Sequence, residues 1–199
     1  MVKAFSYGLG TYDVAKLLEE NNVNYLGVAN TFEGIELRNA GINLPIMVMK
    51  PEVDSFDLVK DFQLTPTIFS LHALKRLIDA VDNTKTLSIS LKIDTGMHRL
   101  GFSLSELNTV LEVLKSDTRI EVASVFTHLA GADDSQFDAF SQQQISTFEK
   151  ACTSLKEHLD APFLQHILNS AGAIRFPHLA KDMVRLGIGL YGIDSSKTK

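Results

Sequence analysis

The chain of 199 residues has a single cysteine, Cys152, so it cannot form an internal disulfide. It also has no apolar run near the roughly 20 residues that a membrane-spanning helix needs, and no basic and then apolar leader. The net charge is -5 and no block of like charges is long enough to act as a binding tail. We therefore expect a cytoplasmic protein that binds neither a membrane nor nucleic acid.

The composition is that of an ordinary globular protein, with 45% hydrophobic and 22% charged residues. A domain of this length can bury about 70% of the surface that its unfolded chain exposes. No linker, repeat or low-complexity segment interrupts the sequence. We expect one domain over residues 1–199, with Cys152 as a packing residue in a helix over 145–159 rather than a catalytic thiol.

Short apolar runs alternate along the chain with segments of helical periodicity. Strands that are apolar throughout and separated by amphipathic helices are typical of a parallel sheet with a covered outer face. Eight such runs favour an α/β fold of the (β/α)8 TIM-barrel type over an open doubly wound sheet, whose Gly-x-Gly-x-x-Gly fingerprint is absent. The predicted strands are 1–2, 25–29, 45–49, 67–69, 87–93, 122–127, 163–168 and 184–191, and the predicted helices are 11–22, 33–40, 57–62, 72–81, 105–115, 135–158 and 171–176.

The first strand is predicted to be truncated, because Met1 stands inside it and strands are normally about five residues long. A length near 200 residues is also close to the lower limit for a barrel. We therefore expect the chain to be a fragment of a longer protein.

Polar residues follow the ends of the predicted strands, where barrel enzymes place their chemistry. Lys3 ends the first run, and a partly desolvated lysine amine can form a Schiff base with a carbonyl cofactor. Lys92 inside an apolar strand needs a partner or must lose its charge, unless it reaches back to water. His128 fits a core residue, an acid, a base or a ring-stacking group. The strand-end set is Lys3, Asn30, Lys50, Lys92 with Arg99, His128, Asn169 with Ser170, and Arg185 with Gly187.

Two neighbouring segments favour an anion as ligand. Ser170 supplies a hydroxyl at the start of a helical piece, and Gly187-Ile-Gly189 permits a close backbone approach. The seventh and eighth units of a barrel often hold phosphate, although such small residues can also simply ease packing. We predict no metal site, because the aspartates near His128 more readily cap the next helix.

Four motifs resemble those of the alanine racemases of fold type III, which depend on pyridoxal 5'-phosphate (PLP). They are MVKAFSYG at 1–8, KIDTGMHRLG at 92–101, NSA at 169–171 and MVRLGIGLYG at 183–192. The match covers nearly the whole chain in the right order.

The resemblance implies a role for each matching residue. Lys3 and Arg185 would be catalytic, with Lys3 carrying PLP and acting as the base on the D-alanine side. Arg185 would face the pyridine nitrogen and, because guanidinium keeps its proton, would leave that nitrogen unprotonated. The other implied cofactor-binding residues are Tyr7, Arg99, His128, Asn169, Ser170, Gly187, Ile188 and Tyr191, and Lys92 would be the lysine that is carbamylated in many relatives.

By the same resemblance, the full-length protein would be a homodimer that interconverts L-alanine and D-alanine for peptidoglycan synthesis. Family members take a second base, a tyrosine, from a C-terminal β-domain. We expect that domain to be absent here and the isolated chain to lack appreciable racemase activity. The alternatives are a non-catalytic PLP-binding barrel that acts as a carrier or regulator, and another fold type III enzyme such as an aldolase or a racemase for other amino acids.

Overall fold

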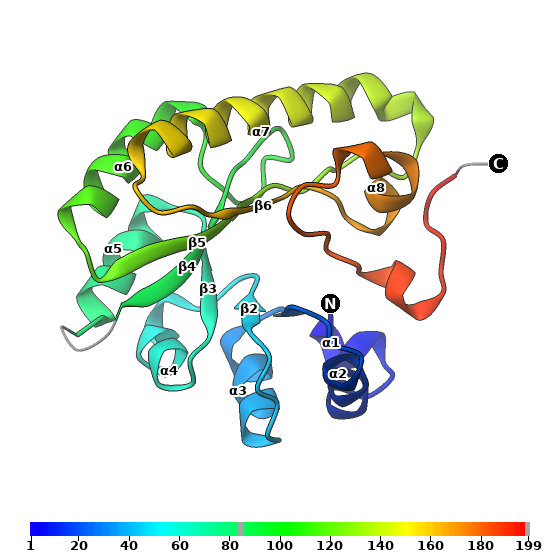
Figure 1. Cartoon of the computed structure of the whole chain (residues 1–199), viewed down its shortest axis with the longest axis horizontal. Coiled ribbons are helices and arrows are strands. Elements are labelled where there is room, and N and C mark those ends of the chain that lie inside the picture. The colour runs from blue at the N-terminus through cyan, green and yellow to red at the C-terminus, as the bar shows by residue number, and fades with distance from the viewer. Residues whose placement is uncertain (83–85, 198–199) are drawn as a thin grey trace.

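The computed structural model describes residues 1–82 and 86–197, which form a curled parallel sheet with helices along its outside (Figure 1). Its strands are hydrogen-bonded in chain order, β1-β2-β3-β4-β5-β6, and all adjacent pairs are parallel. The strands are β1 (Leu26–Val28), β2 (Ile46–Val48), β3 (Thr65–Ile68), β4 (Leu87–Lys92), β5 (Ile120–Phe126) and β6 (Leu164–His166).

Helices connect successive strands, and several begin at a side-chain cap of a residue type that favours helix starts. Asn30, Ser70 and Asn169 each accept a hydrogen bond from the backbone N–H three residues later. The helices are α1 (Lys3–Tyr7), α2 (Thr11–Glu20), α3 (Thr31–Asn39), α4 (Phe56–Asp61), α5 (Leu71–Ala80), α6 (Leu107–Ser116), α7 (Asp138–His158) and α8 (Ser170–Arg175). The 3-10 turns are η1 (Val53–Ser55), η2 (Leu104–Glu106), η3 (Ser135–Phe137), η4 (Pro177–Leu179) and η5 (Ile188–Tyr191).

The α/β barrel architecture is confirmed, but the first and eighth predicted runs are not regular strands. Each of these two runs is joined to the neighbouring segment of the barrel wall by a backbone hydrogen bond. Val2 N donates to Gly27 O at 2.9 Å, and Arg185 N donates to Leu168 O at 3.0 Å. The Met1 nitrogen donates to Leu186 O at 2.9 Å and so joins the two runs. The first run has too few residues for a ladder, and the eighth turns into η5 directly after residue 187.

α1 is a left-handed turn rather than an ordinary helix. Four successive residues without a glycine, Ala4 to Tyr7, have φ of 51, 54, 50 and 57°. A left-handed conformation costs each such residue roughly 1–2 kcal/mol, so surrounding contacts must hold the turn. It carries the two residues that the first motif singled out, Lys3 and Tyr7.

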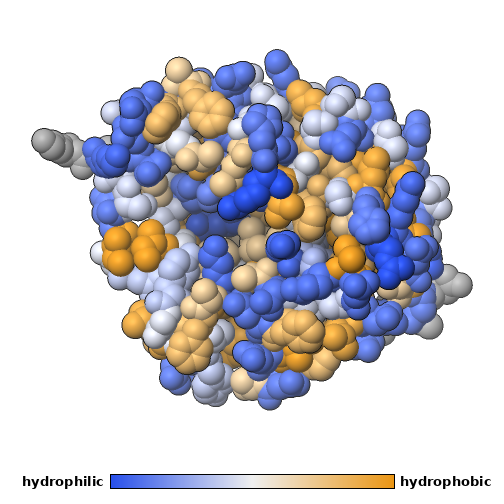
Figure 2. All heavy atoms as spheres, turned by 180° about the vertical axis from the view of Figure 1, so that it is seen from behind, coloured by the Kyte–Doolittle hydropathy of each residue, from blue (hydrophilic) through white to orange (hydrophobic). Residues whose placement is uncertain are grey.

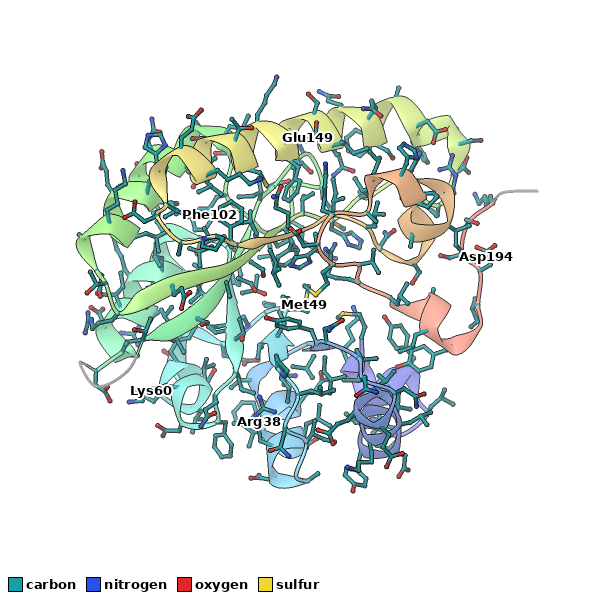
Figure 3. The ribbon with its side chains drawn as sticks, in the orientation of Figure 1. Arg38, Met49, Lys60, Phe102, Glu149 and Asp194 are labelled. Carbon is teal, nitrogen blue, oxygen red and sulfur yellow. The ribbon has the colours of Figure 1, made fainter. Side chains whose placement is uncertain are left out.

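The core lies between the sheet and the helices and continues into the barrel. Cys152 is buried on α7, which confirms it as a packing residue, and burial raises the pKa of its thiol to about 12. Arg38 of α3 donates to carbonyl oxygens of the loops before β2 and β3, including Ile42 at 2.7 Å and Leu44 at 2.8 Å (Figure 3).

Hydrophilic side chains predominate on the face shown in Figure 2, with apolar ones interspersed. Among the described residues, no helix combines the length and apolar character needed to span a membrane.

Candidate active site

A cavity of about 710 Å³ lies at the carboxyl ends of the strands. Met49, just after β2, lies in the middle of the curled sheet in Figure 3 and belongs to its lining. The fold therefore brings together residues that the sequence spreads over nearly 190 positions. The lining includes Lys3, Tyr7, Lys92, Arg99, His128, Asn169, Ser170, Arg185, Gly187 and Ile188, which are all the predicted site residues except Tyr191.

The cavity lining is rich in positive charge. Its cationic side chains come from five different segments of the chain, whereas Glu52 is the one carboxylate among the described lining residues. Such an excess of one sign in a concave site raises the local concentration of ligands of the opposite sign. The arrangement suits an anionic ligand. The cations are Lys3, Lys50, Lys92, Arg99 and Arg185.

Glu33, in the first turn of α3, holds the left-handed turn that carries Lys3. Its carboxylate accepts from the Ala4 amide at 2.9 Å and from the Ala29 amide, just after β1, at 2.6 Å. One side chain thus ties the residue after Lys3 to the end of β1. This role of Glu33 could not be predicted from the sequence, because an acidic residue three positions after Asn30 is typical of an ordinary helix start.

Arg185 is buried and almost fully hydrogen-bonded. One terminal nitrogen, Nη1, pairs with His166 Nδ1 at 2.8 Å and donates to His166 O at 3.0 Å. The other, Nη2, donates to Thr127 O at 2.5 Å and to Ile167 O at 3.3 Å. The guanidinium also lies 4.9 Å from the centre of the Phe126 ring.

Among the described residues, nothing accepts the remaining N–H of Arg185, on Nε, so this donor is left for a ligand. Burial lowers the pKa of Arg185 to about 9. This value is still above neutral pH, so the side chain stays protonated there. It therefore combines a fixed position, a positive charge and one free donor.

Lys92, at the end of β4, is 6% exposed and takes no ion-pair partner within the described part of the chain. Burial, together with the neighbouring Arg99 and Arg185, lowers the pKa of its amine to about 8. A minor fraction of the amine is therefore neutral near physiological pH, and a neutral amine is a nucleophile.

The imidazole of His128, two residues after β5, is neutral. Burial and the charges of Arg185 and Lys92 lower its pKa to about 3. The loop that carries it is held by Gln144 of α7, which donates to His128 O at 3.1 Å and accepts from the Ala130 amide at 2.9 Å. Gln144 was not predicted, and its only signal was a polar residue on the mainly apolar buried face of a helix.

The last two motifs meet in a small polar cradle. The Ser170 hydroxyl accepts from the amides of Gly187 at 2.9 Å and Gly189 at 3.0 Å. A Cβ at Gly187 would lie 2.9 Å from the Tyr7 hydroxyl oxygen, so only glycine leaves this space open. Two hydroxyls and several backbone amides thus converge, which are groups of the kind that bind a phosphate, and in this structure the amides of Gly187 and Gly189 donate to Ser170 Oγ.

Asn169 and Tyr191 support the cradle from its edges. Asn169 caps α8 and donates from Nδ2 to Leu129 O at 3.1 Å. Tyr191 lies outside the cavity lining: its hydroxyl donates to Met1 O at 2.9 Å and its ring packs against Tyr7 at 5.0 Å. The structure thus places Tyr191 against Tyr7 and outside the cavity lining.

The fold and the site together define an α/β-barrel protein with a cation-lined pocket for an anionic ligand, built around a lysine, a buried arginine and a hydroxyl-glycine cradle. Comparison with known protein families identifies the family to which this chain belongs. Residues 1–195 match the family model "Alanine racemase, N-terminal domain", and the chain belongs to this family.

Individual relatives agree. The chain is 36% identical over 196 residues to "Alanine racemase 1" of Oceanobacillus iheyensis, covering 97% of this chain and 52% of that protein. It is 37% identical to the alanine racemase of Carboxydothermus hydrogenoformans, covering 96% and 52%. The solved alanine racemase of Clostridium difficile 630 in complex with cycloserine superposes with a TM-score of 0.91 at 34% identity, covering 98% of this chain and 54% of that one. The chain therefore spans about half the length of the relatives it matches.

Proposed function

We propose that this chain is the cofactor-binding half of a PLP-dependent alanine racemase that interconverts L-alanine and D-alanine for peptidoglycan synthesis. The observation that carries the proposal is the meeting, in one cavity, of Lys3, Arg185 and the cradle of Ser170 and Gly187. The proposal includes a cytoplasmic location, which is the expectation from the sequence, and a homodimer for the full-length protein, which the resemblance to the family implies.

The residues present fit PLP. The Tyr7 and Ser170 hydroxyls and the amides of Gly187 and Ile188 would bind the phosphate, and Asn169 would support them by capping α8. His128, neutral because burial lowers its pKa to about 3, can lie against an aromatic ring without adding charge. When bound, the cofactor supplies an electron sink for the α-carbon from which a proton is removed.

Lys3 is proposed to hold the cofactor covalently and then, as a free amine, to accept or return the α-proton on one face of the substrate. The hydrogen bond that the Ala4 amide donates to Glu33 keeps the start of the turn in place while the Lys3 amine changes partner. Tyr191, whose ring packs at a tilt against that of Tyr7, would limit the movement of the phosphate-binding hydroxyl.

Arg185 is proposed to donate its free Nε–H to the ring nitrogen of the cofactor. Because a guanidinium does not give up its proton at working pH, that nitrogen would stay unprotonated. With Arg185 in this position, the cofactor would supply only a weak electron sink, a chemistry that would favour return of the proton over transamination.

We further propose that Lys92 is carbamylated. Its neutral amine would attack carbon dioxide, forming an N–C bond and releasing a proton, so that a buried cation becomes an anion. Arg99, which lines the same cavity, could then pair with the new carboxylate and donate to the phenolic oxygen of the cofactor. The mutual repulsion that now lowers the pKa of Lys92 would become an attraction.

Racemisation needs a base on each face of the α-carbon. In the family, the second base is a tyrosine of the C-terminal β-domain, and this chain spans about half the length of its relatives. We therefore propose that the isolated 199 residues bind PLP but show no appreciable racemase activity. A rate close to that of a complete alanine racemase would overturn this part of the proposal.

The first test is an absorbance spectrum of the chain with added PLP, followed by borohydride reduction and peptide mapping by mass. We expect the label on Lys3. The Lys3→Arg variant should not be labelled, whereas Lys50→Arg, which changes another lysine of the same cavity, should be labelled like the parent. No label on a chain shown to be folded by circular dichroism would refute the assignment.

A non-catalytic PLP-binding barrel is the alternative that the same label would leave open. A racemase assay of the full-length protein distinguishes these two functions. Racemase activity there supports the enzyme, and a labelled Lys3 without activity supports a carrier or regulator.

A further inference from the structure

Three hydroxyl side chains lie at one level inside the barrel, away from the cavity. Thr67 of β3 pairs in register with Ser90 of β4, and Ser90 pairs with Ser124 of β5. Thr67 and Ser90 are 0% exposed and Ser124 is 3% exposed. A buried hydroxyl is costly unless it is hydrogen-bonded, so a row of them in an apolar barrel needs a reason.

The row leads to Arg185 through His166. The Ser90 and Ser124 hydroxyl oxygens are 2.6 Å apart, and Ser124 Oγ is 3.2 Å from His166 Nε2. His166 is fully buried, stacks on Phe126 with ring centres 4.8 Å apart, and receives Arg185 on Nδ1 at 2.8 Å. Thr67 Oγ1, by contrast, has no hydrogen-bond partner in the described part of the chain.

The direction of each hydrogen bond follows from the arginine. A guanidinium can only donate, so His166 Nδ1 must accept and carries no proton. Burial and the charge of Arg185 hold the pKa of His166 well below its usual value, so the ring is neutral and its one proton is on Nε2. That N–H must donate to Ser124, whose own hydroxyl is then free to donate to Ser90.

We propose that Ser124, supported by Ser90, is a positioning residue for Arg185. By accepting from Nε2, Ser124 keeps His166 in the tautomer that can receive the guanidinium, and Arg185 thereby keeps its free N–H directed at the cavity. Without that acceptor, His166 either leaves a buried N–H unpaired or moves its proton to Nδ1. A proton on Nδ1 would face the N–H of Arg185 and break the hydrogen bond between Nη1 and Nδ1.

The test uses the 199-residue chain labelled with ¹⁵N-histidine, first without cofactor. In the parent, the His166 nitrogens should show a single tautomer with the proton on Nε2. Ser124→Ala should give a mixture of tautomers or exchange broadening, and Ser90→Ala a smaller change in the same direction. Thr67→Val, which removes the unpartnered hydroxyl of the same row, should match the parent and controls for loss of a buried hydroxyl.

The second readout is the affinity for PLP, and this part rests on the proposed function. Ser124→Ala should bind PLP about tenfold more weakly, equivalent to about 1.4 kcal/mol, while Thr67→Val binds like the parent. A Ser124→Ala chain with an unchanged His166 tautomer overturns the inference, as does an altered tautomer with unchanged PLP affinity. A parent chain that does not bind PLP refutes the proposed function instead, and the tautomer still decides whether Ser124 controls His166. Should Ser124→Ala not fold, Ser90→Ala provides the same comparison.

Discussion

Replacing Lys92 by methionine should stabilise the chain at neutral pH. The side chains are similar in length, and the change removes a buried cation that has no ion-pair partner in the described part of the chain. Arg99 and Arg185, which also lower the pKa of Lys92, would lose a repelling neighbour. Replacing a buried charge that has no ion-pair partner in the described residues by an apolar group of like volume is expected to raise stability.

The magnitude follows from the pKa of Lys92, which falls from 10.5 in the unfolded chain to about 8 in the folded one. A difference of about 2.5 multiplied by 1.36 kcal/mol corresponds to about 3 kcal/mol. Between these two pKa values the unfolded state binds more protons, so the stability of the parent rises with pH. The penalty is complete below pH 8 and shrinks to about 2 kcal/mol at pH 9.

The assay is urea unfolding of both chains at pH 7 and pH 9, in buffer freed of carbon dioxide so that the amine stays unmodified. Lys92→Met should be more stable by about 3 kcal/mol at pH 7, and its advantage should narrow by about 1.4 kcal/mol at pH 9. Lys50→Met, which removes an exposed lysine of the same cavity, controls for the loss of any cation. An advantage that does not change with pH, or a less stable Lys92→Met chain, would refute the reasoning.

Three further outcomes are expected. Glu33→Gln should lower the free energy of unfolding by about 1–3 kcal/mol and slow labelling of Lys3, because the amide group cannot accept both backbone N–H groups; Glu36→Gln on the exposed face of the same helix should do neither. Gly187→Ala should weaken PLP binding about tenfold with little loss of stability, since its Cβ displaces the Tyr7 hydroxyl; equal affinity would argue against the cradle. Cys152 should not react with a thiol reagent at pH 8 until the chain is unfolded, and fast reaction of the native chain would contradict its burial.

The helices and the six regular strands could be predicted from the sequence, because apolar periodicity and caps such as Asn30 and Asn169 are local signals. The irregular segments could not. Residues 184–191 are as apolar as a strand, yet the backbone turns into η5 as it approaches Ser170, a residue 17 positions earlier. The left-handed turn of α1 is likewise held by a distant residue, Glu33.

The polar residues at the predicted strand ends were enough to predict much of the cavity lining, because a barrel places every strand end at one rim. Lys3, Lys92, His128 and Arg185 needed only that topology to meet. Tyr191 belongs to a motif as well, but its hydroxyl binds Met1 O behind the cradle. Membership of a motif therefore did not predict whether a residue lines the cavity.

The sequence by itself determined the alternation of strands and helices, the order of the motifs and the family, because these depend on residue types and their spacing. Only the tertiary structure decided the charge states and supporting contacts. The lowered pKa of Lys92 and the path from Ser124 through His166 to Arg185 depend on burial and on distances between separate strands. No local pattern encodes these, since each arises when segments far apart in the chain exclude water from the same small volume.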